Sequence, residues 1–212
     1  ASSDKAHGDA SVLPYTADMP ANGRHPYDVS KSCTDLLAMS YAATYDLPVT
    51  IARCGNIYGG GDLNWSRIVP GTIRSLWLGQ RPQIRSNGLY TRDYIYVQDV
   101  VDAYFALAER CTDDGVRGEA FNFSPQTRLS VLEIARSIQR LMNRPDLEPA
   151  ILDQARGEIR DQYLDSSKAH QRLEWTARYN LEDGLAETIA WYARFLEAQA
   201  PLPDPCASSK LG

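Results

Sequence analysis

The clearest pattern of apolar and polar residues lies at 28–45. Apolar residues recur there at intervals of three, four or one, at Val29, Cys33, Leu36, Leu37, Tyr41 and Tyr45. This spacing is typical of a helix with one buried face, so we expect a helix over 28–45 that packs through its apolar stripe. Asp28 lies in the first turn, where a carboxylate interacts favourably with the helix dipole.

The rest of the chain alternates between short strand-like runs and helical periods, which indicates an α/β fold. Ser130 and Glu133 form a capping-box pattern at the start of one predicted helix. Strands are expected at 49–53, 81–86, 91–97, 118–124 and 147–152. Helices are expected at 66–79, 98–111, 129–143, 167–173 and 181–197, and the Pro-rich tail 201–212 is expected to be disordered.

Length and charge exclude several classes of protein. A chain of 212 residues suits one domain, or one domain with a smaller appendage. With 22 basic and 27 acidic residues, the net charge of −5 argues against nucleic acid as a partner. No apolar run approaches the roughly 18 residues of a membrane span, and the first residues lack a signal-peptide core. We therefore expect a cytoplasmic protein with no membrane contact.

The cysteines and histidines do not form a metal-binding pattern. They are far apart and contain no C-x-x-C motif. We expect structural thiols and no metal ion. The residues concerned are Cys33, Cys54, Cys111, Cys206, His7, His25 and His170.

Tyr27 and Lys31 form a Y-x-x-x-K pair near the start of the first predicted helix. Residues four apart share a helix face, so the Lys31 ammonium can favour the phenolate of Tyr27. Such a phenolate can act as a general base. The pair alone is common in surface helices, and its neighbours must decide its meaning.

Glycines 59–61 follow a predicted strand but do not form a dinucleotide-binding turn, because the chain has no G-x-x-G-x-x-G or G-x-G-x-x-G motif. Asp62 comes next and would oppose a bound phosphate. We interpret the cluster as a flexible bend.

Six motifs occur in a recognisable order: SSDKAHGD, YDVSK, ARCGNIYGGG, TRDYIYVQDVVDAY, GEAFNFS and YLDSSKAHQRLEW. From residue 1 to about 196 the chain resembles the carboxyl-terminal portion of extended short-chain dehydrogenase/reductases, namely the NAD-dependent nucleotide-sugar epimerases and dehydratases. The resemblance implies the end of a Rossmann-like doubly wound sheet at 1–60. It also implies a smaller α/β substrate-binding domain, mainly 61–200, with segments near 90–125 returning to the sheet.

The resemblance implies catalytic roles for Ser3, Tyr27 and Lys31, with Tyr27 and Lys31 also meeting NAD, which we favour over NADP. The sequence Ser3-Asp4-Lys5 looks like the S/T-D-K pattern of 4,6-dehydratases, with CDP-glucose enzymes the most similar. In that reading Asp4 protonates the departing O6, and Lys5 assists removal of the C5 proton. The alternative is that Asp4 and Lys5 are an exposed turn pair.

For the substrate, the resemblance implies that Asn56 contacts the sugar nucleotide and that Arg92 meets the diphosphate. Arg156 is a second candidate for the diphosphate, and Arg67 lies in a segment similar to one of CDP-glucose dehydratases. Trp65 is displaced relative to that pattern, so the nucleotide base stays open.

The amino-terminal half of the resembled enzymes, which carries the glycine-rich turn, is not in this sequence. We expect a 4,6-dehydratase fragment that is inactive in isolation and has no measurable affinity for NAD. A C4 epimerase and a catalytically silent subunit-interaction module are the alternatives. The resemblance also implies a homodimer formed through helices 28–45 and 98–110.

Overall fold

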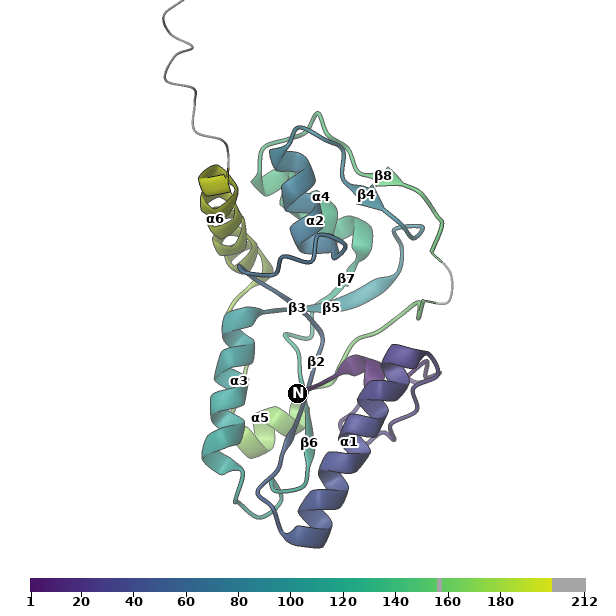
Figure 1. Cartoon of the computed structure of the whole chain (residues 1–212), viewed down its shortest axis with the longest axis vertical. Helices are drawn as coiled ribbons and strands as arrows, with labels where there is room; N and C mark the ends of the chain where they lie inside the picture. The colour runs from purple at the N-terminus through teal and green to yellow at the C-terminus, as the bar shows by residue number, and fades with distance from the viewer. Residues whose placement is uncertain (156–157, 200–212) are drawn as a thin grey trace, which may run out of the picture.

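The computed structural model describes residues 1–155 and 158–199, which form two groups of helices and strands, one above the other in Figure 1. Arg156 and the predicted disordered tail at 201–212 lie outside these residues. Within the described ranges, no helix is both long enough and apolar enough to cross a membrane. The α/β class predicted from the sequence is confirmed.

The lower group is built on a parallel three-stranded sheet, and its two longer strands are buried along their whole length. Full burial is expected for parallel strands covered on both faces. One long helix lies on one side of this sheet and two helices lie on the other (Figure 1). The strands, in spatial order, are β1 (Ser2–Ser3), β2 (Ile51–Cys54) and β6 (Ala120–Phe123). The helices are α1 (Pro26–Tyr45), α3 (Val97–Arg110) and α5 (Ser167–Leu173).

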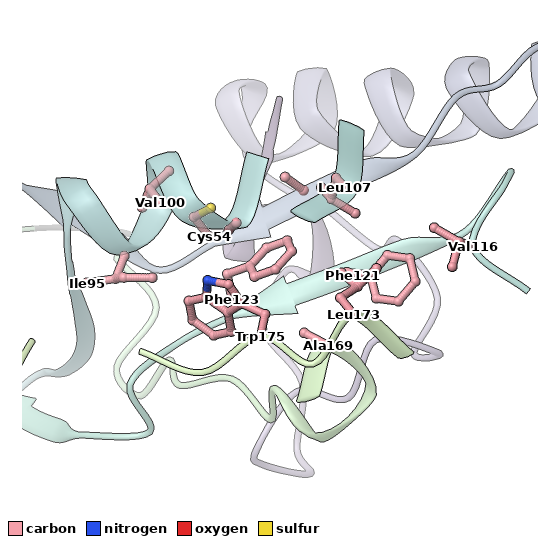
Figure 2. Close-up of a cluster of buried hydrophobic side chains, with 12 residues drawn as sticks. Cys54, Ile95, Val100, Leu107, Val116, Phe121, Phe123, Ala169, Leu173 and Trp175 are labelled. Carbon is pink, nitrogen blue, oxygen red and sulfur yellow. The ribbon is translucent and has the colours of Figure 1, made fainter. Parts of the chain in front are cut away.

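Aromatic and aliphatic side chains fill the space between the sheet and helices α3 and α5 (Figure 2). Phe123 meets Trp175 edge to face, with ring centroids 5.0 Å apart. The Trp175 indole also donates a hydrogen bond to the Asp99 carbonyl at 3.2 Å. The segment that follows α5 is therefore fixed to the start of α3.

The upper group surrounds a second small sheet, in which β5 lies parallel to β3 and antiparallel to β7. Because β5 runs directly into α3, it connects the upper group to the lower one. The strands are β3 (Asn56–Tyr58), β5 (Thr91–Tyr96) and β7 (Arg128–Ser130). The helices that share a second hydrophobic core there are α2 (Ile68–Trp77), α4 (Val131–Leu141) and α6 (Leu181–Gln199).

Helix α1 buries its polar face, so the prediction that its apolar stripe is buried is wrong for this chain. The Ser32 hydroxyl donates to the Ala6 carbonyl at 2.9 Å, and the Asp35 carboxylate accepts from Arg53 Nε at 2.6 Å. These bonds fix α1 to the residues that follow β1 and to β2. The stripe faces outward instead, with these residues exposed: Val29, Cys33, Leu36, Leu37, Tyr41 and Tyr45.

The predicted capping box at the start of α4 is confirmed. The Ser130 hydroxyl accepts from the Glu133 N–H at 3.2 Å, and the Glu133 carboxylate accepts from the Ser130 N–H at 2.7 Å. Two strands are shorter than predicted. The segment 81–86 contains only β4 (Gln83–Ile84), and the segment 147–152 contains only β8 (Ala150–Ile151). These two strands pair in parallel at the edge of the upper group.

Glycines 59–61 provide close packing, which corrects the expectation of a flexible bend. A Cβ at Gly59 would lie 2.4 Å from Val97 Cγ1, and one at Gly60 would lie 2.3 Å from Trp191 Cγ. Gly61 has φ +91°, a conformation that favours glycine. The segment therefore fits tightly between α3 and α6 before it turns toward α2.

Candidate active site

A cavity of about 740 Å³ lies where the two groups of elements meet. Its lower wall includes residues beside β1 and the first turn of α1, and its upper wall includes α2 and the 80–86 segment. Six residues singled out from the sequence line it: Ser3, Lys5, Tyr27, Asn56, Arg67 and Arg92. Asp4 and Lys31 are not among the lining residues, but Asp4 contacts Lys5 and Lys31 contacts Tyr27. Arg156 lies outside the described residues.

Ser3, Asp4 and Lys5 form a hydrogen-bonded group at the end of β1. The chain turns there into a short 3₁₀ helix (Asp4–His7), and the Ser3 hydroxyl accepts from the Lys5 N–H at 3.4 Å. Asp4 is only 1% exposed; its Oδ1 accepts from the Ser3 hydroxyl at 2.9 Å and from Lys5 Nζ at 3.3 Å. Asp4 and Lys5 are therefore a partly buried pair at the cavity wall and not an exposed turn pair.

Tyr27 and Lys31 lie on the first two turns of α1, facing the cavity region. The Tyr27 side chain is 57% exposed and lines the cavity. Lys31 Nζ lies 5.7 Å from the centroid of the Tyr27 ring, within the range of a cation–π contact. The i, i+4 spacing thus brings the ammonium and the phenol onto one face of the helix.

Asn56 is placed by the pairing of β3 with β5, opposite Tyr94, and Arg92 by the pairing of β5 with β7, opposite Leu129. Gly55 allows β3 and β5 to approach closely, because a Cβ at this position would lie 2.7 Å from the Asp93 carbonyl oxygen. Arg92 is 7% exposed and donates to the carbonyls of Thr91 and Arg160 at 2.8 and 2.9 Å. These bonds hold a guanidinium group at the cavity wall.

The loop at 59–67 carries Arg67 and is held in place by α6. The Tyr192 hydroxyl donates to the Asp62 carbonyl at 2.6 Å, and burial raises the pKa of Tyr192 to about 12, so this donor stays neutral. The Trp65 ring contacts both Tyr192 and Arg74. Its centroid lies 5.8 Å from the centroid of the Tyr192 ring and 5.0 Å from Arg74 Cζ. Arg67 itself is exposed and pairs with Asp62 at 3.0 Å.

Three further residues of the cavity carry no recognisable motif in the sequence. Arg81 and Arg85 line the cavity from the β4 segment, where 81, 83 and 85 are exposed while 82, 84 and 86 are buried. This alternation of a β-segment is a signal that could have identified both arginines. Tyr94 also lines the cavity, and burial raises the pKa of its hydroxyl well above the usual value.

The cavity is basic, although the chain carries a net charge of −5. Among the described lining residues, the acidic ones are Asp62 and Glu158, and the basic ones are Lys5, Arg67, Arg81, Arg85 and Arg92. A concave surface with an excess of guanidinium groups attracts anions, and arginine suits phosphate oxygens in particular. The cavity is therefore suited to a ligand with a phosphate or diphosphate group.

Two buried ionisable groups lie close to the site. Burial, reinforced by the nearby Arg53 guanidinium, lowers the pKa of His7 to about 4. Burial also raises the pKa of Asp93 to about 6, although this carboxyl accepts a hydrogen bond from the Ser124 hydroxyl and one from the Leu164 N–H at 3.0 Å. At neutral pH His7 is therefore uncharged, whereas Asp93 retains its proton mainly below about pH 6.

A parallel α/β sheet with a Y-x-x-x-K helix beside a basic cavity defines the class of extended short-chain dehydrogenase/reductases. Residues 1–188 match the family model described as GDP-mannose 4,6 dehydratase. The chain belongs to this family, whose relatives are NAD-dependent nucleotide-sugar dehydratases and epimerases.

Individual relatives support the same assignment. The chain is 29% identical to dTDP-glucose 4,6-dehydratase of Mycolicibacterium smegmatis over 96% of its own length and 61% of that protein. It superposes on dTDP-glucose 4,6-dehydratase of Bacillus anthracis, solved in complex with NAD, with a TM-score of 0.81 and 26% identity, covering 92% of this chain and 61% of that one.

A solved epimerase matches equally well. For UDP-glucose 4-epimerase of Thermotoga maritima with UDP-glucose, the TM-score is 0.83 and the identity 26%, over 92% of this chain and 62% of that one. The chain spans less than two thirds of the length of each of these three proteins.

Proposed function

We propose that this chain is the nucleotide-sugar-binding part of an NAD-dependent nucleotide-sugar 4,6-dehydratase. The observation that supports this most directly is that Lys5 and Tyr27 line one basic cavity, with Asp4 hydrogen-bonded to Lys5 behind the wall. A dehydration needs an acid and a base in addition to the tyrosine that takes the C4 hydroxyl proton. A simple C4 epimerisation does not need them. The activity of the Mycolicibacterium relative is consistent with this reaction.

The nucleotide sugar occupies the cavity with its diphosphate toward the arginines. Arg92 is the best-placed contact, because its guanidinium is fixed by two carbonyls at the wall. Arg67 and Arg85 provide further positive charge from the loop and from the β4 segment. Asn56, at the start of β3, contacts the substrate between these arginines and the catalytic end.

Residues at the start of α1 would hold the cofactor, NAD. Tyr27 lines the cavity together with Ser3, and Lys31 contacts the Tyr27 ring, so these two residues would meet its nicotinamide portion. When bound, NAD would supply the hydride chemistry, as acceptor of the C4 hydride and donor of the hydride to C6. The Bacillus anthracis dehydratase, which shares this fold, binds the same cofactor.

The residues of this chain move the protons. Tyr27 takes the proton of the C4 hydroxyl. The Ser3 hydroxyl, which donates to Asp4 Oδ1 in the structure, turns from Asp4 to donate to the same oxygen. Lys5 takes the C5 proton, which the new C4 carbonyl makes acidic, and Asp4 gives a proton to the C6 oxygen, which leaves as water. The product is a 4-keto-6-deoxy sugar, one water lighter than the nucleotide hexose.

The second candidate is a C4 epimerase, which the similarity to the Thermotoga structure favours. Full-length protein incubated with UDP-glucose, dTDP-glucose or CDP-glucose separates the two reactions. We expect a 4-keto-6-deoxy sugar, detected by NMR. Formation of the C4 epimer without loss of water would contradict the proposal.

The isolated chain allows a direct test of the cavity. By calorimetry we expect it to bind a nucleoside diphosphate such as UDP, dTDP or CDP, and to show no measurable affinity for NAD. Arg92→Met should weaken nucleotide binding about 10- to 100-fold, because it removes charge-assisted hydrogen bonds. Arg140→Met is the matched control, because Arg140 pairs with Glu182 on the surface outside the cavity lining. Equal affinity for all three proteins would argue for a catalytically silent module.

We also propose a homodimer formed through α1. Its exposed apolar stripe includes Leu36, Leu37 and Tyr41, which are 60%, 61% and 52% exposed. Contiguous apolar surface of this kind marks an interaction site. Helix α3 also exposes an apolar side chain, Phe105. In Figure 1, however, α3 and α1 lie on opposite sides of the sheet, so the geometry favours an interface built on α1 without α3.

A further inference from the structure

Lys5 has a second polar partner that no motif indicates. Its Nζ donates to Gln162 Oε1 at 2.5 Å, while Asp4 Oδ1 and Oδ2 lie at 3.3 and 3.4 Å. The two partners approach from different parts of the chain, because Gln162 follows Lys5 by 157 positions. Lys5 itself is 23% exposed and lines the cavity.

Gln162 is rigidly held. It is fully buried, and its backbone N–H donates to the Thr91 carbonyl at 3.1 Å. The residues around it are bound on both sides, since Asp161 bridges to Thr91 and Leu164 bridges to Tyr15. These bonds fix the backbone of Gln162, and burial confines its side chain, although the amide nitrogen has no hydrogen-bond partner among the described residues. A confined amide oxygen can hold a flexible lysine in one orientation, which is the usual role of residues that support a catalytic group.

The three acceptor atoms around Lys5 Nζ match the three N–H bonds of an ammonium group, which must lose one proton before Lys5 can act as a base. A neutral amine has two N–H bonds and one lone pair, and an ammonium group has three N–H bonds and none. With one N–H directed to Gln162 and one to Asp4, the lone pair of Lys5 is left for the cavity. Without Gln162, the amine could rotate and direct an N–H bond at the substrate.

The neutrality of Gln162 is also important. A carboxylate at this position would stabilise the ammonium form of Lys5 and so oppose its use as a base. An amide oxygen accepts the hydrogen bond without adding a charge. Asp4 is then the single acidic side chain in hydrogen-bond contact with Lys5 among the described residues.

We propose that Gln162 is a positioning residue that orients Lys5 for removal of the C5 proton. This inference rests on the proposed dehydratase function. Gln162 acts through Lys5 and does not contact the sugar, so its loss should slow the elimination while leaving substrate binding and C4 oxidation largely intact.

The test uses the full-length protein and the nucleotide glucose that it converts. Gln162→Met keeps the length of the side chain but removes the acceptor, and Gln162→Asn withdraws the amide by one methylene. Both should slow loss of deuterium from C5-labelled substrate about 10- to 100-fold, the scale expected when a catalytic group is misplaced. Reduced nicotinamide should accumulate, and the dissociation constant for the nucleoside diphosphate should stay unchanged.

Two controls separate positioning from general damage. Gln139→Met removes another buried glutamine hydrogen bond, from Gln139 Nε2 to the Arg144 carbonyl at 3.1 Å, and should leave the exchange rate unchanged. In a Lys5→Met background, Gln162→Met should cause no further loss, because residues that act as a unit are non-additive.

The possible failures are distinguishable. If unsubstituted protein forms no 4-keto sugar, the proposed function is overturned and this inference falls with it. If the keto sugar forms but Gln162→Met and Gln162→Asn exchange C5 at the normal rate, only the inference is overturned. Multiplicative losses in the Lys5→Met background would also overturn it, since Gln162 would then act independently of Lys5.

Discussion

Helices α1 and α4 are both amphipathic, yet they bury opposite kinds of residue. In α4 the buried face is mainly apolar: Ile134, Ala135 and Ile138 are completely buried, and the two isoleucines belong to the upper core. In α1 the buried face contains Asp28, Ser32 and Asp35, and the apolar stripe is exposed. One helix is held by packing and the other by directed polar bonds.

The difference follows from what each helix must do. Packing tolerates small shifts, whereas hydrogen bonds and ion pairs fix distance and angle. Helix α1 carries Tyr27 and Lys31, and its inner bonds run to Ala6 and Arg53, close to the Ser3-Asp4-Lys5 group. A polar interface therefore sets the position of one half of the candidate site relative to the other.

The largest predicted effect is loss of the ion pair beneath α1. Asp35 and Arg53 are 0% and 2% exposed, so Asp35→Ala would leave a buried guanidinium unpaired. We expect the free energy of unfolding to fall by about 3–5 kcal/mol, measured by urea denaturation. The paired substitution Asp35→Leu with Arg53→Met should cost less than Asp35→Ala alone. If the double variant is the less stable, the ion pair itself stabilises α1.

The corresponding change in α4 is Ile138→Ala. It should cost about 2–5 kcal/mol, because it removes buried methyl groups and leaves a cavity in the upper core. The same urea titration measures it, and Ile138→Val is the graded control, with an expected loss of about 0.5–1.5 kcal/mol. If Ile138→Ala and Ile138→Val lower the free energy of unfolding by similar amounts, the upper core closes around the smaller side chain and leaves no cavity.

The polar region beneath α1 should also respond to pH through His7. Burial lowers the pKa of His7 to about 4, whereas an unfolded histidine titrates near 6.5. The unfolded chain therefore binds the extra proton, and stability should fall as pH drops from about 6.5 to 4, by at most about 1.4 kcal/mol per pH unit. His7→Gln should remove this contribution in urea titrations at several pH values.

The carboxyl group of Asp93 should give a pH dependence of stability opposite in sign to that of His7, and it serves as a control. Its pKa is raised to about 6, so the folded state retains the proton, and this contribution to stability is lost as pH rises from about 4 to 6. The two contributions oppose each other between about pH 4 and 6, so Asp93→Asn should expose the loss of stability toward low pH, and His7→Gln should reverse it. Parallel changes in both variants would contradict the assignment of either group.

The sequence predicted the fold where local signals and tertiary packing agree. The helix at 129–143, with Ser130 and Glu133 at its start, is an example, because its apolar period coincides with its buried face. The helix at 28–45 was located well, but its buried face was not, since apolar spacing identifies a stripe and not the surface that covers it. The polar residues of α1 find partners such as Arg53, 18 positions from Asp35, which periodicity does not reveal.

The candidate site also combines residues that have a local sequence signal with residues that are placed only by tertiary contacts. Ser3, Lys5, Tyr27, Asn56 and Arg92 were found through short motifs, and they line one cavity. Gln162 carries no local signal, because its contact with Lys5 depends on how the 158–166 segment returns between the two groups of elements. Residues that support a site are harder to find from sequence than residues with their own chemistry.

A smaller effect is expected at the helix starts. Ser130→Ala removes the cap of α4 and should cost about 1 kcal/mol in thermal or urea unfolding. The residue before α1, His25, makes no side-chain capping bond, so His25→Ala should be nearly neutral. A comparable loss at both positions would mean that α1 also depends on its first turn.

The smallest effect on the folded monomer is expected on the exposed stripe of α1. Leu37→Ser and Tyr41→Ser should change the free energy of unfolding by no more than about 0.5 kcal/mol at low protein concentration, because both side chains are already in water. The same substitutions should abolish self-association of the full-length protein in sedimentation experiments, since they place polar groups in the proposed interface. Substitutions on α3, such as Phe105→Ser, should leave association intact. If Phe105→Ser dissociates the dimer and Tyr41→Ser does not, the interface lies on α3, and the exposed stripe of α1 needs another partner.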